Sequence, residues 1–162
     1  MIDMKNLIST SKVLEIKTKF LPIFLRPDIL LNNITELDTC MIFNLKEKYD
    51  IQGIILDVDE TLRKNMQPIP VYIKEWLENL IKNIKVIVLS NGYDKRVEDY
   101  LKNIGITYIS LACKPMRRGF LKSALELNIK PNKILVIGDS LVDDILGGKI
   151  SGMMTGLVKK LK

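Results

Sequence analysis

The sequence predicts an α/β fold, a doubly wound, Rossmann-like parallel sheet with helices on both of its faces. Three runs that are apolar along their length and rich in β-branched residues alternate with segments of helical pattern. Strands that are apolar on both faces are typical of a parallel sheet covered by helices on both sides. Right-handed crossovers between such strands produce the doubly wound arrangement. With 162 residues, the chain is predicted to form a single domain, residues 1–162.

The predicted strands begin at residue 53. Gly53–Asp57, Lys85–Ser90 and Lys133–Asp139 are the three strong strands. Residues 106–109 predict a weaker strand, and residues 153–158 are a candidate for a last one.

Helices are predicted in the intervals between these strands. Residues 71–82 place Trp76, Leu77 and Leu80 among the apolar positions of a helix. Further helices are expected at about 94–103, at 116–127, which stops before Pro131, and at 141–146, which is followed by Gly147 and Gly148. Residues 1 to about 35 are expected to be helical decoration at the N-terminus rather than a separate domain.

The three strong strands each end in a polar cluster. These clusters are Asp57-Val58-Asp59, Ser90-Asn91-Gly92 and Gly138-Asp139-Ser140. Ligands of open α/β sheets bind outside the carboxyl ends of the strands, so the three clusters are expected to converge on one site.

Composition narrows the chemistry that such a site can perform. The chain has no histidine, which excludes Ser-His-Asp and Cys-His catalysis and every histidine-ligated metal site. Acid–base work then falls to carboxylates, lysines or tyrosines. The two cysteines, Cys40 and Cys113, fit no metal-binding spacing and indicate a reducing compartment. The net charge of +6 suits an anionic partner, or it reflects solvated surface lysines.

No segment is expected to span a membrane. The most apolar stretch near the start, residues 20–25, is broken by Pro22 and closed by Arg26, short of the ~20 residues that a bilayer requires. Lysines spread through the first twenty residues also argue against a secretory signal. The expected location is therefore cytoplasmic, either free or at the inner face of the membrane.

Two carboxylates at the end of the first strand indicate phosphoryl transfer. A covalent aspartyl-phosphate divides the slow hydrolysis of a phosphomonoester into two easier steps. A carboxylate that attacks a phosphate dianion needs a cation to offset the repulsion, and Mg²⁺ prefers oxygen ligands of this kind.

The segment Asp57-Val58-Asp59-Glu60-Thr61-Leu62 resembles the first motif, DxDxT, of the haloacid dehalogenase superfamily of phosphohydrolases. Three further motifs match in order: Ser90-Asn91 resembles the second, Lys114-Pro115 the third, and Gly138-Asp139 with Asp143 and Asp144 the fourth. The match spans roughly residues 50–158, and all four motifs in order are far more specific than one alone.

The resemblance implies a role for each motif residue. Asp57 would be the nucleophile and a metal ligand, and Asp59 would act as general acid and base and bind the metal through its backbone carbonyl. Ser90 and Asn91 would hold the phosphoryl oxygens, and Lys114 would neutralise phosphate and nucleophile. Asp139 and one of two candidates, Asp143 or Asp144, would complete the metal site, with Asp144 favoured. Thr61 would either contact phosphate or cap the following turn. The complete set of acids argues against an inactive binding protein that has kept the fold.

The gaps between the motifs leave no room for a cap domain over the site. Capless members of the superfamily tend to act on large substrates or to complete the site with a partner surface. The chain is most similar to the YqeG-type phosphatases, related to the phosphatidylglycerophosphate phosphatases of mitochondria and plastids. The supporting features are Phe20-Leu21-Pro22, Arg26-Pro27-Asp28, Gly53 at the start of the first strand, Lys114 to Phe120, and Gly138-Asp139 through Asp144 to Gly148. Glu60 stands where those relatives often carry asparagine.

This resemblance implies dephosphorylation of phosphatidylglycerophosphate to phosphatidylglycerol. Residues 2–25 mix apolar and lysine side chains, as an interfacial helix would, or they pack on the sheet. Arg117 and Arg118 are candidates to hold the internal phosphodiester of the lipid. The alternative, which applies to Arg63 and Lys64 as well, is that they are ordinary solvated charges. The alternative is a soluble phosphatase acting on a sugar phosphate, nucleotide or phosphoprotein. No nucleic-acid partner is expected, because the basic residues form no long cluster.

Overall fold

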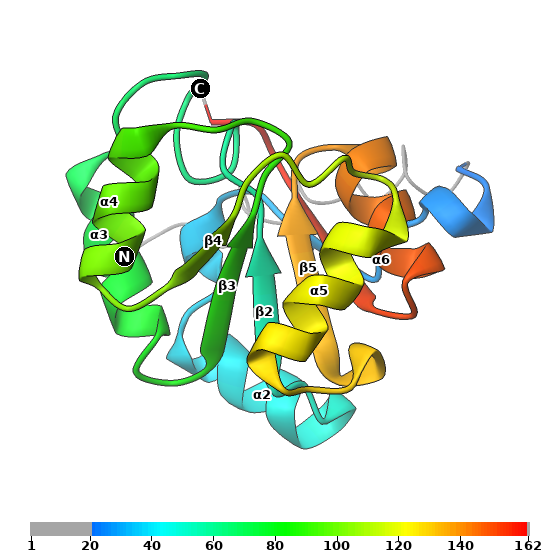
Figure 1. Ribbon diagram of the computed structural model, residues 1–162. Coiled ribbons are helices and arrows are strands. Elements are labelled where there is room, and N and C mark those ends of the chain that lie inside the picture. Colours follow the sequence, from blue (N-terminus) through cyan, green and yellow to red (C-terminus); the bar gives the residue numbers. More distant parts are fainter. Residues whose placement is uncertain (1–20, 162) are drawn as a thin grey trace.

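The computed structural model describes residues 21–161 and shows one six-stranded sheet in the order β1-β6-β5-β2-β3-β4 (Figure 1). The strands are β1 (Ile29–Leu31), β2 (Gly53–Leu56), β3 (Lys85–Leu89), β4 (Thr107–Ile109), β5 (Ile134–Gly138) and β6 (Met154–Val158). Every neighbouring pair is parallel. The predicted doubly wound α/β fold is confirmed.

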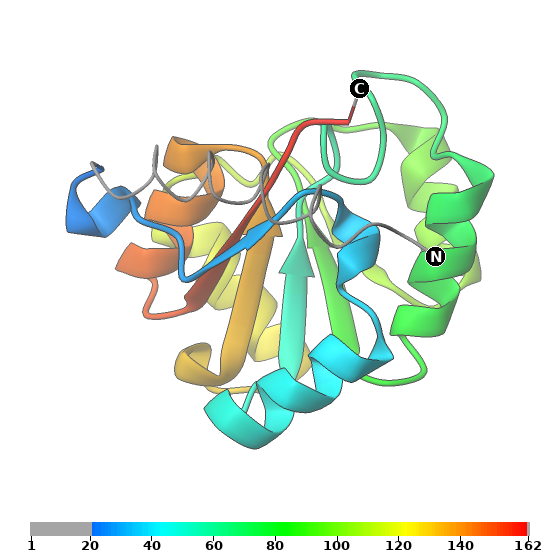
Figure 2. The same ribbon diagram turned by 180° about the vertical axis from the view of Figure 1, so that it is seen from behind.

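Helices cover both faces of this sheet. They are η1 (Ile23–Leu25), η2 (Ile34–Glu36), α2 (Thr39–Tyr49), α3 (Val71–Leu80), α4 (Lys95–Asn103), α5 (Arg117–Leu127), η3 (Pro131–Lys133), η4 (Leu141–Leu146) and α6 (Gly147–Ile150). α5 and α6 lie on the face seen in Figure 1, and α2 lies in front of the sheet in the opposite view of Figure 2.

Two apolar cores result from the alternation of side chains along the central strands. Ile54 and Leu56 of β2 pack with side chains of α2, α3 and α4 on one face. Ile55, between them, packs on the other face with side chains of α5 such as Phe120. Because β2 and β5 are buried on both faces, their sequences are continuously apolar, which made them predictable.

The N-terminal region departs from the prediction. Residues 29–31 form the edge strand β1, so the expectation of purely helical decoration up to residue 35 is wrong there. The Asp28 carboxylate anchors this strand by accepting hydrogen bonds from the Thr155 backbone N–H, at 2.8 Å, and hydroxyl, at 2.9 Å. Helix α2 was not predicted either. Its N-cap is Asp38, whose carboxylate accepts from the Met41 N–H.

The predicted helix at 141–146 is present in a different form. η4 is a π-helical segment, and the helix continues through Gly147 and Gly148 as α6 instead of ending before them. Gly147 is needed for close packing, because a Cβ there would lie 2.4 Å from the ring of Phe120.

Within residues 21–161, no cap domain covers the C-terminal edge of the sheet. Between β2 and β3 the chain forms only α3 and its loops, and between β3 and β4 only α4. Across residues 21–161, no helix is long and apolar enough to cross a bilayer. The predicted interfacial segment 2–25 lies mostly outside the described residues, and its described end contains only the short η1.

Candidate active site

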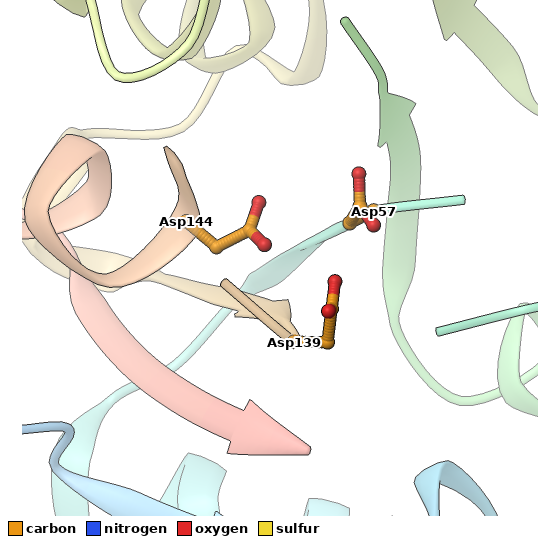
Figure 3. A group of neighbouring side chains, drawn as sticks. All are labelled: Asp57, Asp139 and Asp144. Atoms are coloured by element: carbon orange, nitrogen blue, oxygen red, sulfur yellow. The ribbon is translucent and has the colours of Figure 1, made fainter. Parts of the chain in front are cut away.

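Three carboxylates meet at the C-terminal edge of the two central strands (Figure 3). Asp57 directly follows β2, Asp139 directly follows the neighbouring β5, and Asp144 belongs to η4. One oxygen of each lies within 4.8 Å of those of the others. Asp143, the other candidate for the fourth motif, is not part of this cluster.

Gly138 makes room for Asp144. A Cβ at position 138 would lie 2.0 Å from Asp144 Oδ2 and 2.1 Å from its Cγ, so any side chain there would displace the carboxylate. The Ser140 N–H donates a hydrogen bond to Asp144 Oδ2 at 3.1 Å. The Ser140 hydroxyl accepts from the Asp143 N–H at 3.1 Å and so caps the start of η4. The turn after β5 therefore holds the Asp144 carboxylate beside Gly138, the last residue of β5.

Lys114 is a buried cation that joins two of these acids. Its Nζ lies 2.6 Å from Asp57 Oδ1 and 2.6 Å from Asp144 Oδ1. Asn91 positions the lysine from the loop after β3. The Lys114 N–H donates to Asn91 Oδ1 at 2.6 Å, and Asn91 Nδ2 donates to the Lys114 carbonyl at 3.1 Å. The side chain of Asn91, expected to bind substrate, is thus engaged with the backbone of Lys114.

The electrostatics of the cluster reflect its burial. Desolvation, and next the charge of Asp144, raise the pKa of Asp57 to about 7, although Lys114 opposes the shift. Desolvation and Asp144 also raise the pKa of Asp139, against the nearby Lys160, whose Nζ lies 3.4 Å away. For Lys114, burial would lower the pKa, but Asp144 and Asp57 together raise it above its usual value.

Two hydroxyls of the first and second motifs are buried beside the cluster. The Thr61 hydroxyl donates to Asp57 Oδ2 at 3.3 Å, so it holds the predicted nucleophile. The Ser90 hydroxyl accepts from the Gly92 N–H at 3.1 Å. Arg117 and Arg118, at the start of α5, are exposed.

Arg63 is the main residue that the sequence analysis misjudged. Only 2% of it is exposed, so the expectation of a solvated charge is wrong. Its Nε donates to Asp59 Oδ1 at 2.8 Å, and its Nη1 donates to Asp94 Oδ2 at 2.5 Å. The spacing of four from Asp59 was the only available hint, because Asp94 is 31 residues away in the chain.

These residues fit a divalent cation. Asp57, Asp139 and Asp144 offer three carboxylate oxygens in one cluster, a donor set that Mg²⁺ prefers. Burial first, and next the negative charge of Asp144, raise the pKa values of Asp57 and Asp139, and a bound cation would favour the ionised form of both carboxylates.

Comparisons with known proteins agree with this geometry. The sequence model of a family described as haloacid dehalogenase-like hydrolase matches residues 67–152. The "Probable phosphatase YqeG" of Bacillus subtilis (strain 168) is 36% identical over 140 residues, covering 83% of this chain and 77% of that protein.

Solved structures share the fold at low sequence identity. A HAD-like family hydrolase from Porphyromonas gingivalis aligns with a TM-score of 0.58 at 13% identity, covering 69% of this chain and 93% of that one. A 2-haloacid dehalogenase from Pseudomonas syringae pv. Tomato DC3000 aligns with a TM-score of 0.51 at 14% identity, covering 65% of this chain and 85% of that one.

Proposed function

The chain belongs to the haloacid dehalogenase-like hydrolase family and is a phosphatase, and we propose that it converts phosphatidylglycerophosphate to phosphatidylglycerol. Phosphatases of this family use a divalent metal ion, and the proposed one here is Mg²⁺. Asp57, Asp139 and Asp144 would hold it with the backbone carbonyl of Asp59. When bound, the cation offsets the negative charge of the carboxylate and the phosphate that must approach each other.

Asp57 is the proposed nucleophile. A carboxylate oxygen of Asp57 attacks phosphorus, the bond from phosphorus to the leaving oxygen breaks, and Asp59 gives that oxygen its proton. Asp59 then takes a proton from a water whose oxygen attacks phosphorus, the bond from phosphorus to the Asp57 oxygen breaks, and inorganic phosphate and the free Asp57 carboxylate result. Lys114, 2.6 Å from Asp57, neutralises the phosphoryl group, and Ser90 and the Asn91 segment bind its oxygens.

The observation that carries the lipid proposal is the exposed apolar rim of this open edge. The rim consists of one or two large apolar side chains on each segment that follows β2, β3, β4 and β5, namely Met66, Tyr93, Leu111, Met116 and Val142. Such a set around an uncapped site suits a substrate presented at an apolar surface. Arg117 and Arg118 lie on the same edge, where each basic residue near an anionic membrane contributes about 1 kcal/mol.

The experiment that tests this function is phosphate release from phosphatidylglycerophosphate in mixed micelles with Mg²⁺. A soluble aryl phosphate and the Asp57→Asn variant are assayed in parallel. Fast turnover of the lipid and slow turnover of the aryl phosphate are expected. Faster turnover of the aryl phosphate than of the lipid would be consistent with phosphatase activity, but it would reject the lipid as the substrate in favour of a soluble one.

A pair of surface variants tests the rim. Leu111 and Met116 are 69% and 65% exposed, and replacing both by serine should weaken apparent binding to the micelle by about tenfold, because apolar area is lost. Leu125→Ser is the matched control, since Leu125 is 81% exposed but lies near the far end of α5. Hydrolysis of the aryl phosphate should not change in either variant. If the double variant and Leu125→Ser weaken apparent binding to the micelle equally, the rim is not the surface that contacts the lipid.

A further inference from the structure

Arg63 bridges two carboxylates that come from different crossovers of the sheet. Asp59 belongs to the turn after β2, and Asp94 is the N-cap of α4, after β3. The side chains of Arg63 and Asp94 are 3% and 7% exposed. A buried arginine with two buried or half-buried acidic partners is costly to desolvate, so its presence calls for a reason beyond stability.

The bonds to Asp59 all fall on one of its two oxygens. Oδ1 accepts from Arg63 Nε at 2.8 Å and from the Met66 N–H at 3.4 Å. Among the residues that the structure describes, Oδ2 has no hydrogen-bond partner. It lies near Gly92, where a Cβ added to the glycine would be 3.9 Å from this oxygen. Gly92 belongs to the same loop as Ser90 and Asn91, so Oδ2 is the oxygen on the side of the proposed phosphate site.

We propose that Arg63 is a positioning residue for proton transfer. Its guanidinium fixes Oδ1 of Asp59, so that Oδ2 is the oxygen that delivers the proton to the leaving group. This inference rests on the proposed role of Asp59 as general acid. It assigns to Arg63 a part in the reaction that the motif comparison does not contain.

The second carboxylate, Asp94, explains why position 63 holds an arginine and not a lysine. The planar guanidinium donates from Nε to Asp59 and from Nη1 to Asp94 at the same time. The two carboxylates therefore share the positive charge of Arg63, and through this arginine the start of α4 fixes the orientation of Asp59. A lysine has a single nitrogen and cannot hold both carboxylates in this planar arrangement.

Dependence on the leaving group separates this role from a structural one. An alkyl phosphate needs a proton on its leaving oxygen, whereas 2,4-dinitrophenyl phosphate does not. With Mg²⁺ present, Arg63→Met should lower kcat/KM for an alkyl phosphate by about 10- to 100-fold, since a misplaced catalytic group costs that much. For the dinitrophenyl ester the loss should be below about threefold. Arg63→Lys should fall between wild type and Arg63→Met on the alkyl ester.

Arg96→Met is the matched control. Arg96 donates to the same Asp94 carboxylate at 2.8 Å but donates no hydrogen bond to Asp59, and its side chain is 62% exposed. This variant should stay within about twofold of wild type on both esters. Equal losses on both esters for Arg63→Met, or the same pattern for Arg96→Met, would overturn the proposal.

A double-mutant cycle with Asp59→Asn separates the role of Arg63 from the role of Asp59. Arg63→Met should cause less than about twofold further loss when Asp59 is already asparagine. If Asp59→Asn itself leaves alkyl phosphate hydrolysis intact, the role of Asp59 in the proposed function fails. If Asp59→Asn is slow but Arg63→Met is not, only the present inference fails. Should Arg63→Met not fold, Arg63→Lys is carried through the same cycle and decides the question.

Discussion

Asp57 is a residue whose environment favours chemistry at the expense of stability. Burial away from water, and next the charge of Asp144, raise its pKa to about 7. The ionised form, which the proposed attack on phosphorus requires, is therefore harder to form here than in a solvent-exposed aspartate. Such sites often gain stability when the functional group is removed.

We therefore expect opposite effects of Asp57→Asn on activity and on stability. The rate of phosphate release should fall by at least ~10³-fold, because no covalent intermediate can form. Without Mg²⁺, the free energy of unfolding should equal that of the wild type or exceed it by up to ~2 kcal/mol. Urea unfolding and phosphate release measure the two quantities. A variant that retains activity would contradict the role of Asp57 as nucleophile.

Gly138 is a second residue whose role is defined by what surrounds it. In Gly138→Ala the new methyl group would lie 2.0 Å from Asp144 Oδ2, so the carboxylate of Asp144 would have to move. The rate with a soluble phosphate ester should drop by about 100-fold, and a higher Mg²⁺ concentration should be needed for half-maximal activity.

Gly105→Ala serves as the control for Gly138→Ala. Gly105 has a φ of +78° but nothing within 4 Å of the added methyl group. The substitution should cost about 1–2 kcal/mol of stability through backbone strain while the rate stays close to wild type. If both variants lose activity in proportion to their stability, the close approach at Gly138 is not the cause.

Asp94, at the start of α4, connects this helix to the turn after β2 through Arg63. Asp94 caps the helix by accepting from the Arg96 N–H at 2.9 Å, and it pairs with the side chains of Arg96 and Arg63. These bonds, that of Arg96 first, hold the pKa of Asp94 well below its usual value. A lowered pKa means that the folded state binds the proton more weakly than the unfolded state does. The stabilisation is thus present above pH ~4 and declines as the pH falls further.

Asp94→Asn isolates this charge effect because asparagine is also a good N-cap. At pH 7 the variant should be less stable than the wild type by about 2–3 kcal/mol, since Asp59 is then the one carboxylate that still pairs with Arg63. The difference should narrow as the pH is lowered from 5 to 3, measured by urea unfolding at each pH. A difference that is independent of pH would show that the charge of Asp94 is not what stabilises the junction.

For the whole molecule, the three-carboxylate cluster couples metal binding to stability. A cation that binds only the folded state at ten times its Kd contributes about 1.4 kcal/mol, or roughly 3–6 °C in Tm for a domain of this size. Mg²⁺ should raise Tm by that amount, and EDTA should abolish both the rise and the hydrolysis.

A matched pair of variants assigns the ligand in η4. Asp144→Asn should remove the Mg²⁺-dependent rise in Tm, whereas Asp143→Asn should preserve it, because Asp143 is outside the cluster. The opposite outcome would make Asp143 the metal-facing acid of the fourth motif.

The central parallel strands and the edge at which their polar ends lie could be predicted from the sequence. β2 and β5 are buried along their whole length and β3 is buried from Ile87 to Leu89, so all three are apolar runs, and the polar residues after them lie where parallel strands end. The edge strand β1 escaped prediction because three residues are too few for a pattern, and its place is decided by pairing with β6, more than 120 residues away.

Which side chains bind to and orient the motif residues could not be predicted from the sequence. The choice between Asp143 and Asp144 depends on the turn that Gly138 permits, and the engagement of Asn91 depends on a loop 23 residues away. Arg63 reads as a surface charge in the sequence, yet the turn after β2 buries it against Asp59 and Asp94. Composition and periodicity report which residues avoid water, but the partner of a buried polar group depends on how separate segments pack together.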